Sequence, residues 1–188
     1  RDFSINAMAA CINPDCFGTV ADPFGGLRDL ERRSLRVLHS LSFVEDPTRV
    51  LRGSRFEQRY GFTMESSTEE LARRAVEMNM LEEVSGARIR EELLDIIDEE
   101  RPSSAFERLS ALGALSAVVY ESADERRVIE SVYATERAYG VLAERFERRP
   151  RRRVALIASM VVGAERTAAR LRGLGAEPRV RLVDGHRK

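Results

Sequence analysis

Helical periodicity governs the chain from about residue 40 onward and limits the folds open to it. Apolar residues recur there every three or four positions, and successive segments end at stop signals such as Gly61 and Gly113. A strand pattern is confined to the first 38 or so residues, where RSLRVLH alternates and places Leu35 and Val37 on one face. We therefore predict a mainly α fold, in which a short α/β portion precedes an all-helical remainder.

The cap and stop signals divide the helical part into segments. The first predicted helix starts at Ser42, tolerates Pro47 in its first turn and stops at Gly61. A capping box of Ser67 and Glu70 indicates the start of the second. Further helices are expected over 86–99, from a cap at Ser103 or Ser104 to a stop at Gly113, and over 123–146, with one or two more after Pro150. The segment DFSINAMAAC, rich in helix formers, also favours a helix near the N-terminus.

Composition narrows the class of protein. Hydrophobic residues make up 43% of the 188 residues and charged residues 33%, so a packed core is expected. The formal net charge is zero, which argues against a generally basic nucleic-acid coat. No apolar run has the roughly 20 residues of a membrane span, and no signal peptide is recognised. The chain opens at Arg1 within what resembles an element, so we expect a fragment.

Two cysteines, Cys11 and Cys16, stand five positions apart. Structural zinc needs four ligands, and no second Cys or His pair lies near them, so no metal site is expected. We expect two free thiols in a cytoplasmic protein.

The stretch SFVEDPTRVLRGSRF carries an acid and arginines at a spacing of three, beginning with Asp46, Arg49 and Arg52. On a continuous helix Asp46 and Arg49 would share one surface patch. One interpretation is an ordinary ion pair on a solvated face. The other interpretation uses the fact that a carboxylate only accepts hydrogen bonds and a guanidinium only donates them.

Such a pair complements the pairing edges of two nucleobases. Cytosine and adenine each present an exocyclic amino donor beside a ring acceptor, whereas uracil and guanine present a carbonyl beside a ring N–H. The mismatched bases would leave buried polar groups unpaired, at a cost on the order of several kcal/mol. Asp46 and Arg49 could therefore select C and A without a template, and Arg52 could reach a phosphate tail.

Four ordered motifs resemble one known family. EDPTRVLRGSRF is similar to the EDxxR base-selecting segment of class II tRNA nucleotidyltransferases and bacterial poly(A) polymerases. RDFSINAMA resembles their RRDFxxNA motif, DPFGGLRDL their glycine-containing hinge, and GARIREEL a later R-I-x-x-E-L helix that buttresses the nucleotide-binding neck. The resemblance covers about residues 1–115. It implies the edge of a nucleotidyltransferase palm over 1–40, a nucleotide-recognising helical neck over 41–100 and a helical, RNA-binding body over 101–188.

The resemblance also implies roles for individual residues. Asp46 and Arg49 would read the base, and Asp2 would contact the ribose. Arg1 and Arg52 would grip the triphosphate, with Asn6 supporting the pocket. The alternative for Asp2 and Asn6 is helix N-terminal capping. The implied hinge residues, for which an ordinary turn is the alternative, are Asp22, Gly25 and Gly26.

The implied activity is template-independent addition of C and/or A to the 3′ end of tRNA or another RNA from CTP and ATP. In the family, Mg²⁺ is held by carboxylates of an upstream D-x-D region, and this chain contains no D-x-D. We therefore expect no catalytic residue here and no transfer by this chain alone.

A cluster of arginines near residue 150 is a further candidate for contact with RNA phosphates, with a solvated interhelical turn as the alternative. Its members are Arg148, Arg149, Arg151, Arg152 and Arg153. Three other functions stay open: a poly(A) polymerase or A-only enzyme, a non-catalytic RNA- or nucleotide-binding module, and a helical assembly domain.

Overall fold

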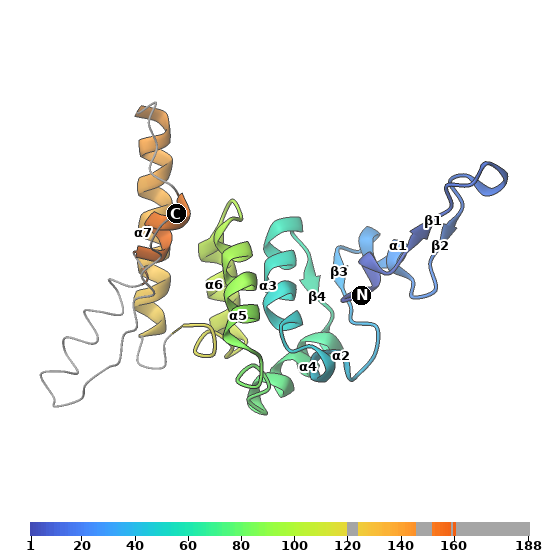
Figure 1. Ribbon diagram of the computed structural model, residues 1–188, viewed down its shortest axis with the longest axis horizontal. Coiled ribbons are helices and arrows are strands. Elements are labelled where there is room, and N and C mark those ends of the chain that lie inside the picture. The colour runs from blue at the N-terminus through green and yellow to red at the C-terminus, as the bar shows by residue number, and fades with distance from the viewer. Residues whose placement is uncertain (120–123, 146–151, 159, 161–188) are drawn as a thin grey trace, which may run out of the picture.

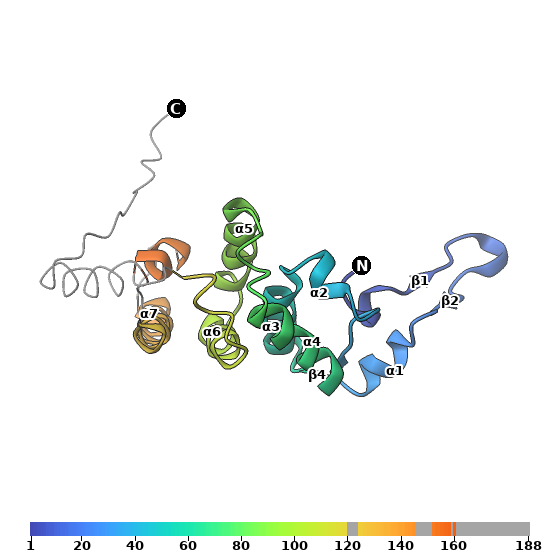
Figure 2. The same cartoon turned by 90° about the horizontal axis from the view of Figure 1, so that it is seen from below.

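A computed structural model describes residues 1–119, 124–145, 152–158 and 160. The elements follow one another along the long axis, from a small hairpin at the N-terminal end to the long helix α7 (Glu125–Arg145) at the other (Figures 1 and 2). The predicted mainly α architecture with a small α/β portion is confirmed. No helix of the described part is long and apolar enough to cross a membrane.

The N-terminal part contains short elements in place of the helix that its composition favours. After the 3₁₀ turn η1 (Ser4–Asn6), strands β1 (Ala9–Ala10) and β2 (Val20–Ala21) pair antiparallel, and helix α1 (Gly26–Glu31) follows. The predicted strand is confirmed as β3 (Ser34–Leu35), which pairs in parallel with β4 (Thr63–Met64). Leu35 and Val37 are both buried, as expected for one face. Strand β4 was not predicted, because its two residues are too few to show the alternation of apolar and polar side chains that marks a strand.

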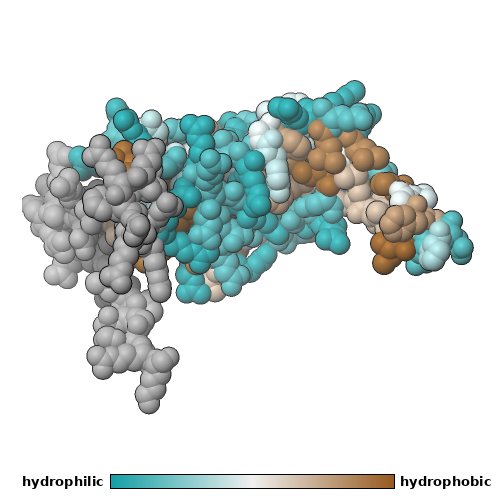
Figure 3. All heavy atoms as spheres, turned by 90° about the horizontal axis from the view of Figure 1, so that it is seen from above, coloured by the Kyte–Doolittle hydropathy of each residue, from teal (hydrophilic) through white to brown (hydrophobic). Residues whose placement is uncertain are grey.

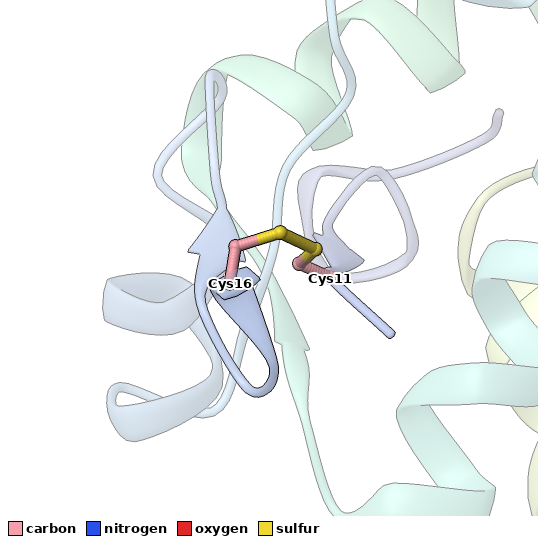
Figure 4. The surroundings of a disulfide bond; sticks show 2 residues. All are labelled: Cys11 and Cys16. Atoms are coloured by element: carbon pink, nitrogen blue, oxygen red, sulfur yellow. A yellow bond between two sulfur atoms is a disulfide. The ribbon is translucent and has the colours of Figure 1, made fainter. Parts of the chain in front are cut away.

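The expectation of two free thiols is wrong, because Cys11 and Cys16 form a disulfide in the β1–β2 hairpin (Figure 4). The short 3₁₀ helix η2 (Pro14–Cys16) turns the chain back, and the amides of Gly18 and Thr19 donate to the carbonyls of Cys11 and Cys16. This turn leaves the two Cα atoms 5.8 Å apart, within the range that a disulfide spans. Spacing alone does not reveal such a turn.

The predicted first helix is broken into two. Helix α2 (Ser42–Glu45) ends at Asp46, whose backbone is extended, and α3 (Arg49–Tyr60) begins after Thr48. The Asp46 side chain accepts hydrogen bonds from the Thr48 amide (3.2 Å) and hydroxyl (2.6 Å), which stabilises this break. The predicted stop is confirmed, since Gly61 adopts a left-handed φ of 64° at the end of α3.

The remaining helices follow the predicted order with shifted ends. They are α4 (Ser66–Glu77), α5 (Gly86–Ile97), α6 (Pro102–Ala111) and α7. The Ser67–Glu70 capping box is absent; the Ser67 hydroxyl instead donates to Glu65. Helix α6 is capped at Arg101 and not at Ser103 or Ser104, so it starts earlier than predicted, because Pro102 suits the first turn. Residues 152–158 are helical, as expected after Pro150.

One buried ionic network ties three helices of this stack together. Glu57 on α3 is 5% exposed and accepts from the Met64 amide at 2.7 Å and from Arg108 Nε at 2.6 Å. Arg108, on α6, also donates to Glu69 on α4 at 2.6 Å. The network fixes α3 between its neighbours, and the opposite half of α3 carries the polar site described next.

Candidate functional site

Four of the predicted nucleotide-binding residues meet in one chain of alternating charges. Asp46 accepts from Arg52 Nη2 at 2.6 Å, and Arg52 Nη1 donates to Asp2 at 3.1 Å. The other oxygen of Asp2 accepts from Arg49 Nε at 3.2 Å. The N-terminal motif and the α2–α3 stretch, although far apart in the sequence, therefore build one cluster.

The contacts in this cluster differ from the helical pairing that the sequence suggested. Asp46 lies in the break before α3, so its ion pairs are with Arg52 and Arg88 and not with Arg49. Arg49 uses Nη1 to donate to the Ser42 carbonyl at 2.5 Å, which holds it against α2. The side chains are mostly covered: Arg49 is 12% exposed, and Asp2 and Asp46 are each 18% exposed.

The ionisation of Asp46 is favoured by these neighbours. Burial raises the pKa of its carboxyl, but the Thr48 hydroxyl and the charges of Arg52 and Arg88 together outweigh burial and place that pKa below its ordinary value. The carboxylate is thus a permanent acceptor near neutral pH, as the base-selection hypothesis requires.

Helix α5 contributes two residues that the site prediction omitted. Arg88 Nη2 donates to both oxygens of Asp46, each at 2.9 Å, and Glu92 lies 3.4 Å from Arg52 Nε. Burial raises the pKa of Glu92 above its ordinary value, although Arg52 and Arg55 pull it down. Both residues lie in the GARIREEL motif, so the sequence marked this helix as part of the site. It did not indicate that Arg88 and Glu92 contact Asp46 and Arg52.

Arg1 and Asn6 lie at the edge of this arrangement. The Asn6 side chain accepts from the Phe3 amide at 3.0 Å and so closes the η1 turn, which corresponds to the capping alternative. Arg1 is exposed and has no ion pair among the described residues. Arg52 is committed to protein groups on both terminal nitrogens. Triphosphate binding by Arg1 and Arg52 stays a prediction.

The predicted hinge forms the start of α1. Asp22 accepts from the amides of Gly26 (2.7 Å) and Leu27 (3.0 Å). These bonds, with that of Leu27 the strongest influence, lower the pKa of the Asp22 carboxyl. Gly25 has a φ of 72°, and a Cβ on Gly26 would lie 2.3 Å from the Ser4 carbonyl oxygen. The glycines thus permit a turn and a close approach, and a hinge role stays a prediction.

The predicted RNA-binding cluster is only partly within the described residues. Arg148, Arg149 and Arg151 lie outside them. Arg153 forms a two-pronged ion pair with Asp98, and Arg152 donates to the Glu100 carbonyl at 2.6 Å. In this structure both arginines attach the helical segment 152–158 to the loop after α5.

The site residues do not fit a divalent metal. No group of three or more His, Cys, Asp or Glu side chains in the described part is arranged to hold one. Asp2, Asp46 and Glu92 are each paired with arginine, whose charge opposes a cation.

Comparisons with known proteins identify the family. The "Poly A polymerase head domain" matches residues 1–36, and the "Probable RNA and SrmB- binding site of polymerase A" matches residues 61–124. An A-adding tRNA nucleotidyltransferase of Geobacter sulfurreducens is 50% identical over 115 residues, which are 61% of this chain and 13% of that protein. The chain belongs to the class II tRNA nucleotidyltransferase and poly(A) polymerase family. The resemblance noted in the sequence is confirmed.

Other members of the family agree in sequence and fold. A multifunctional CCA protein of Neisseria gonorrhoeae is 40% identical over 121 residues, 64% of this chain and 28% of that protein. A solved tRNA nucleotidyltransferase, complexed with a primer tRNA and an incoming ATP analogue, superposes with a TM-score of 0.79 at 34% identity over 86% of this chain and 47% of that one. The chain thus spans 13–28% of these two curated relatives.

Proposed function

We propose that this chain forms the nucleotide-selecting part of an enzyme that adds C and/or A, without a template, to the 3′ end of tRNA from CTP and ATP. The observation that carries the proposal is the covered cluster in which Asp46 and Arg49 are linked through Arg52 and Asp2. Relatives named A-adding tRNA nucleotidyltransferase and multifunctional CCA protein support this activity.

In this proposal the cluster reads the base. Asp46 would accept from the exocyclic amino group of cytosine or adenine, and Arg49 would donate to the adjacent ring acceptor. Asp2 keeps a lone pair on each oxygen beyond its two arginine contacts, so it could accept from a ribose hydroxyl. The fixed positions of these groups would let them discriminate before any transfer occurs.

The proposal also covers the parts of the protein around this site. Residues 1–40 would be the edge of the head, 41–100 the neck and 101–188 a body that meets RNA. Because the described carboxylates do not fit a metal, Mg²⁺ would be held by another part of the enzyme, and this chain would not transfer nucleotides alone. We propose a cytoplasmic location, where tRNA and nucleoside triphosphates are found.

A second candidate is an enzyme that adds only A, and it is favoured by the name of the Geobacter relative. Both candidates use the same two residues, so the choice between C and A does not alter the site chemistry proposed here. A non-catalytic binding module would keep the cluster and lack transfer activity.

The experiment is incorporation of each of the four nucleoside triphosphates onto tRNA lacking its 3′ end, by the full-length protein. Asp46→Asn should reduce the preference for CTP or ATP over UTP and GTP by roughly 5- to 150-fold, because about 1–3 kcal/mol of discrimination depends on the carboxylate. Asp15→Asn, at an exposed position in the hairpin, is the matched control. Unchanged selectivity in the Asp46 variant would contradict the proposal.

A further inference from the structure

Asp46 has no acceptor capacity left for a nucleobase in this structure. Its two oxygens accept five hydrogen bonds: two from Thr48, one from Arg52 and two from Arg88 Nη2. A carboxylate offers about four lone-pair sites. A base could therefore pair with Asp46 only if one of the present donors leaves.

The three residues that supply these donors differ in how readily they can leave. The Thr48 amide and hydroxyl belong to the turn that starts α3. Arg52 is 20% exposed and also donates to Asp2 and Thr48, so its departure would break the whole cluster. Arg88 is 52% exposed, and among the described residues its side chain forms no ion pair other than that with Asp46. An exposed ion pair of this kind contributes little net free energy, so Arg88 leaves most easily.

The contact made by Arg88 also has the chemistry of the proposed ligand. Its Nη2 is a planar –NH₂ donor placed 2.9 Å from each carboxylate oxygen. The exocyclic amino groups of cytosine and adenine are planar –NH₂ donors as well. We propose that Arg88 occupies the position at Asp46 that the base amino group would take, and that it is displaced when cytosine or adenine binds. This inference rests on the proposed function. It gives Arg88 a role in specificity, in addition to the structural support of the neck that the family resemblance implies for α5.

The exchange would sharpen selection. Cytosine and adenine replace the lost donor of Arg88 with an equivalent donor, so Asp46 remains satisfied. Uracil and guanine bring a carbonyl oxygen, which cannot replace Arg88 and is repelled by the carboxylate. For these bases Arg88 stays in place and the position remains occupied.

The test is the affinity of the 188-residue chain for CTP, ATP, UTP and GTP, measured by calorimetry. Arg88→Ala removes the competing donor, so CTP and ATP should bind roughly two- to five-fold more tightly. UTP and GTP affinities should not change. Arg90→Ala is the matched control, because Arg90 is an exposed arginine on α5 with no ion pair in the described structure. In an Asp46→Asn background, Arg88→Ala should have no effect on CTP affinity.

A second readout follows Arg88 directly. In the wild-type chain, CTP should move the side-chain ¹⁵N resonances of Arg88 toward their positions in the Asp46→Asn variant, whereas UTP should not. Unchanged or weaker CTP and ATP binding by Arg88→Ala, or unmoved Arg88 resonances at saturating CTP, would overturn the inference while base selection stands. Equal binding of all four nucleotides by the wild type, unaffected by Asp46→Asn, would instead overturn the proposed function and this inference with it.

Discussion

Single residues hold the N-terminal motif in the orientation that the cluster needs. Gly26 is the clearest case, because α1 approaches the η1 turn so closely that a Cβ would lie 2.3 Å from the Ser4 carbonyl oxygen and 2.9 Å from its carbonyl carbon. Ser4 is also fixed by its hydroxyl, which donates to buried Asp29 at 2.5 Å. The backbone of Ser4 therefore cannot shift easily. Because Asp2 lies only two residues before Ser4, this constraint also helps to hold Asp2 in the cluster.

We predict that Gly26→Ala destabilises the chain by about 1–3 kcal/mol, because the added methyl group forces backbone to move. Urea unfolding measures the loss. Gly140→Ala on α7 is the matched control: no atom of the described residues lies within 4 Å of its Cβ position, so that variant should be as stable as the parent or gain roughly 0.5–1 kcal/mol. Equal stabilities for the two variants would show that the close approach is not a constraint.

At the scale of elements, the helices owe their mutual placement to ionic contacts as well as to the apolar core. Arg108 connects α6 to Glu57 on α3 and Glu69 on α4, while Arg55 on α3 pairs with Asp95 on α5 at 3.1 Å. Of these two sets of contacts, only that of Arg108 includes a carboxylate nearly inaccessible to water, since Glu57 is 5% exposed. The cost of losing a partner is therefore concentrated at Arg108.

Arg108→Met should destabilise the chain by about 3–5 kcal/mol, because among the described residues it leaves the buried Glu57 carboxylate with one backbone amide as its remaining partner. The control is Arg74→Met on α4, where the partner Glu70 is 63% exposed and the change should cost less than about 1 kcal/mol. Chemical denaturation of both variants at one pH gives the comparison. A loss below about 1 kcal/mol for Arg108→Met would show that the network is incidental.

The sequence predicted elements better than it predicted their partners. The Gly61 stop and the shared buried face of Leu35 and Val37 follow from local signals, which act over a few neighbouring residues. The break at Asp46 was missed because Pro47 is compatible with both a first turn and a break. The Arg88–Asp46 contact joins residues 42 positions apart, and no local periodicity encodes such a pairing.

Across the whole molecule, the N-terminal and C-terminal ends of the described chain have different surfaces. Exposed apolar side chains such as Ile12 (81%) and Phe17 (77%) lie in the hairpin, and apolar surface gathers toward this end (Figure 3). The far end carries arginines, two of which are engaged by the loop after α5. Any RNA phosphate that binds Arg153 must compete with Asp98, whose pKa the Arg153 hydrogen bond lowers, so Asp98 is ionised at neutral pH.

This competition gives a prediction for the RNA-binding role of the cluster. Asp98→Asn should free Arg153 and tighten binding of tRNA by the chain by roughly two- to five-fold at low salt, since one exposed ion pair no longer opposes it.

A triple variant tests the arginines themselves. Replacing Arg151, Arg152 and Arg153 together by Glu should weaken binding and reduce the slope of log K against log salt by about 0.7–0.9 for each phosphate that the protein no longer neutralises. Glu83→Gln, a charge change at an exposed site, is the control for net charge. An unchanged salt slope in the triple variant would show that these arginines do not bind phosphate and that Arg152 and Arg153 only attach the 152–158 segment to the loop after α5, because an arginine that never meets phosphate releases no counterions.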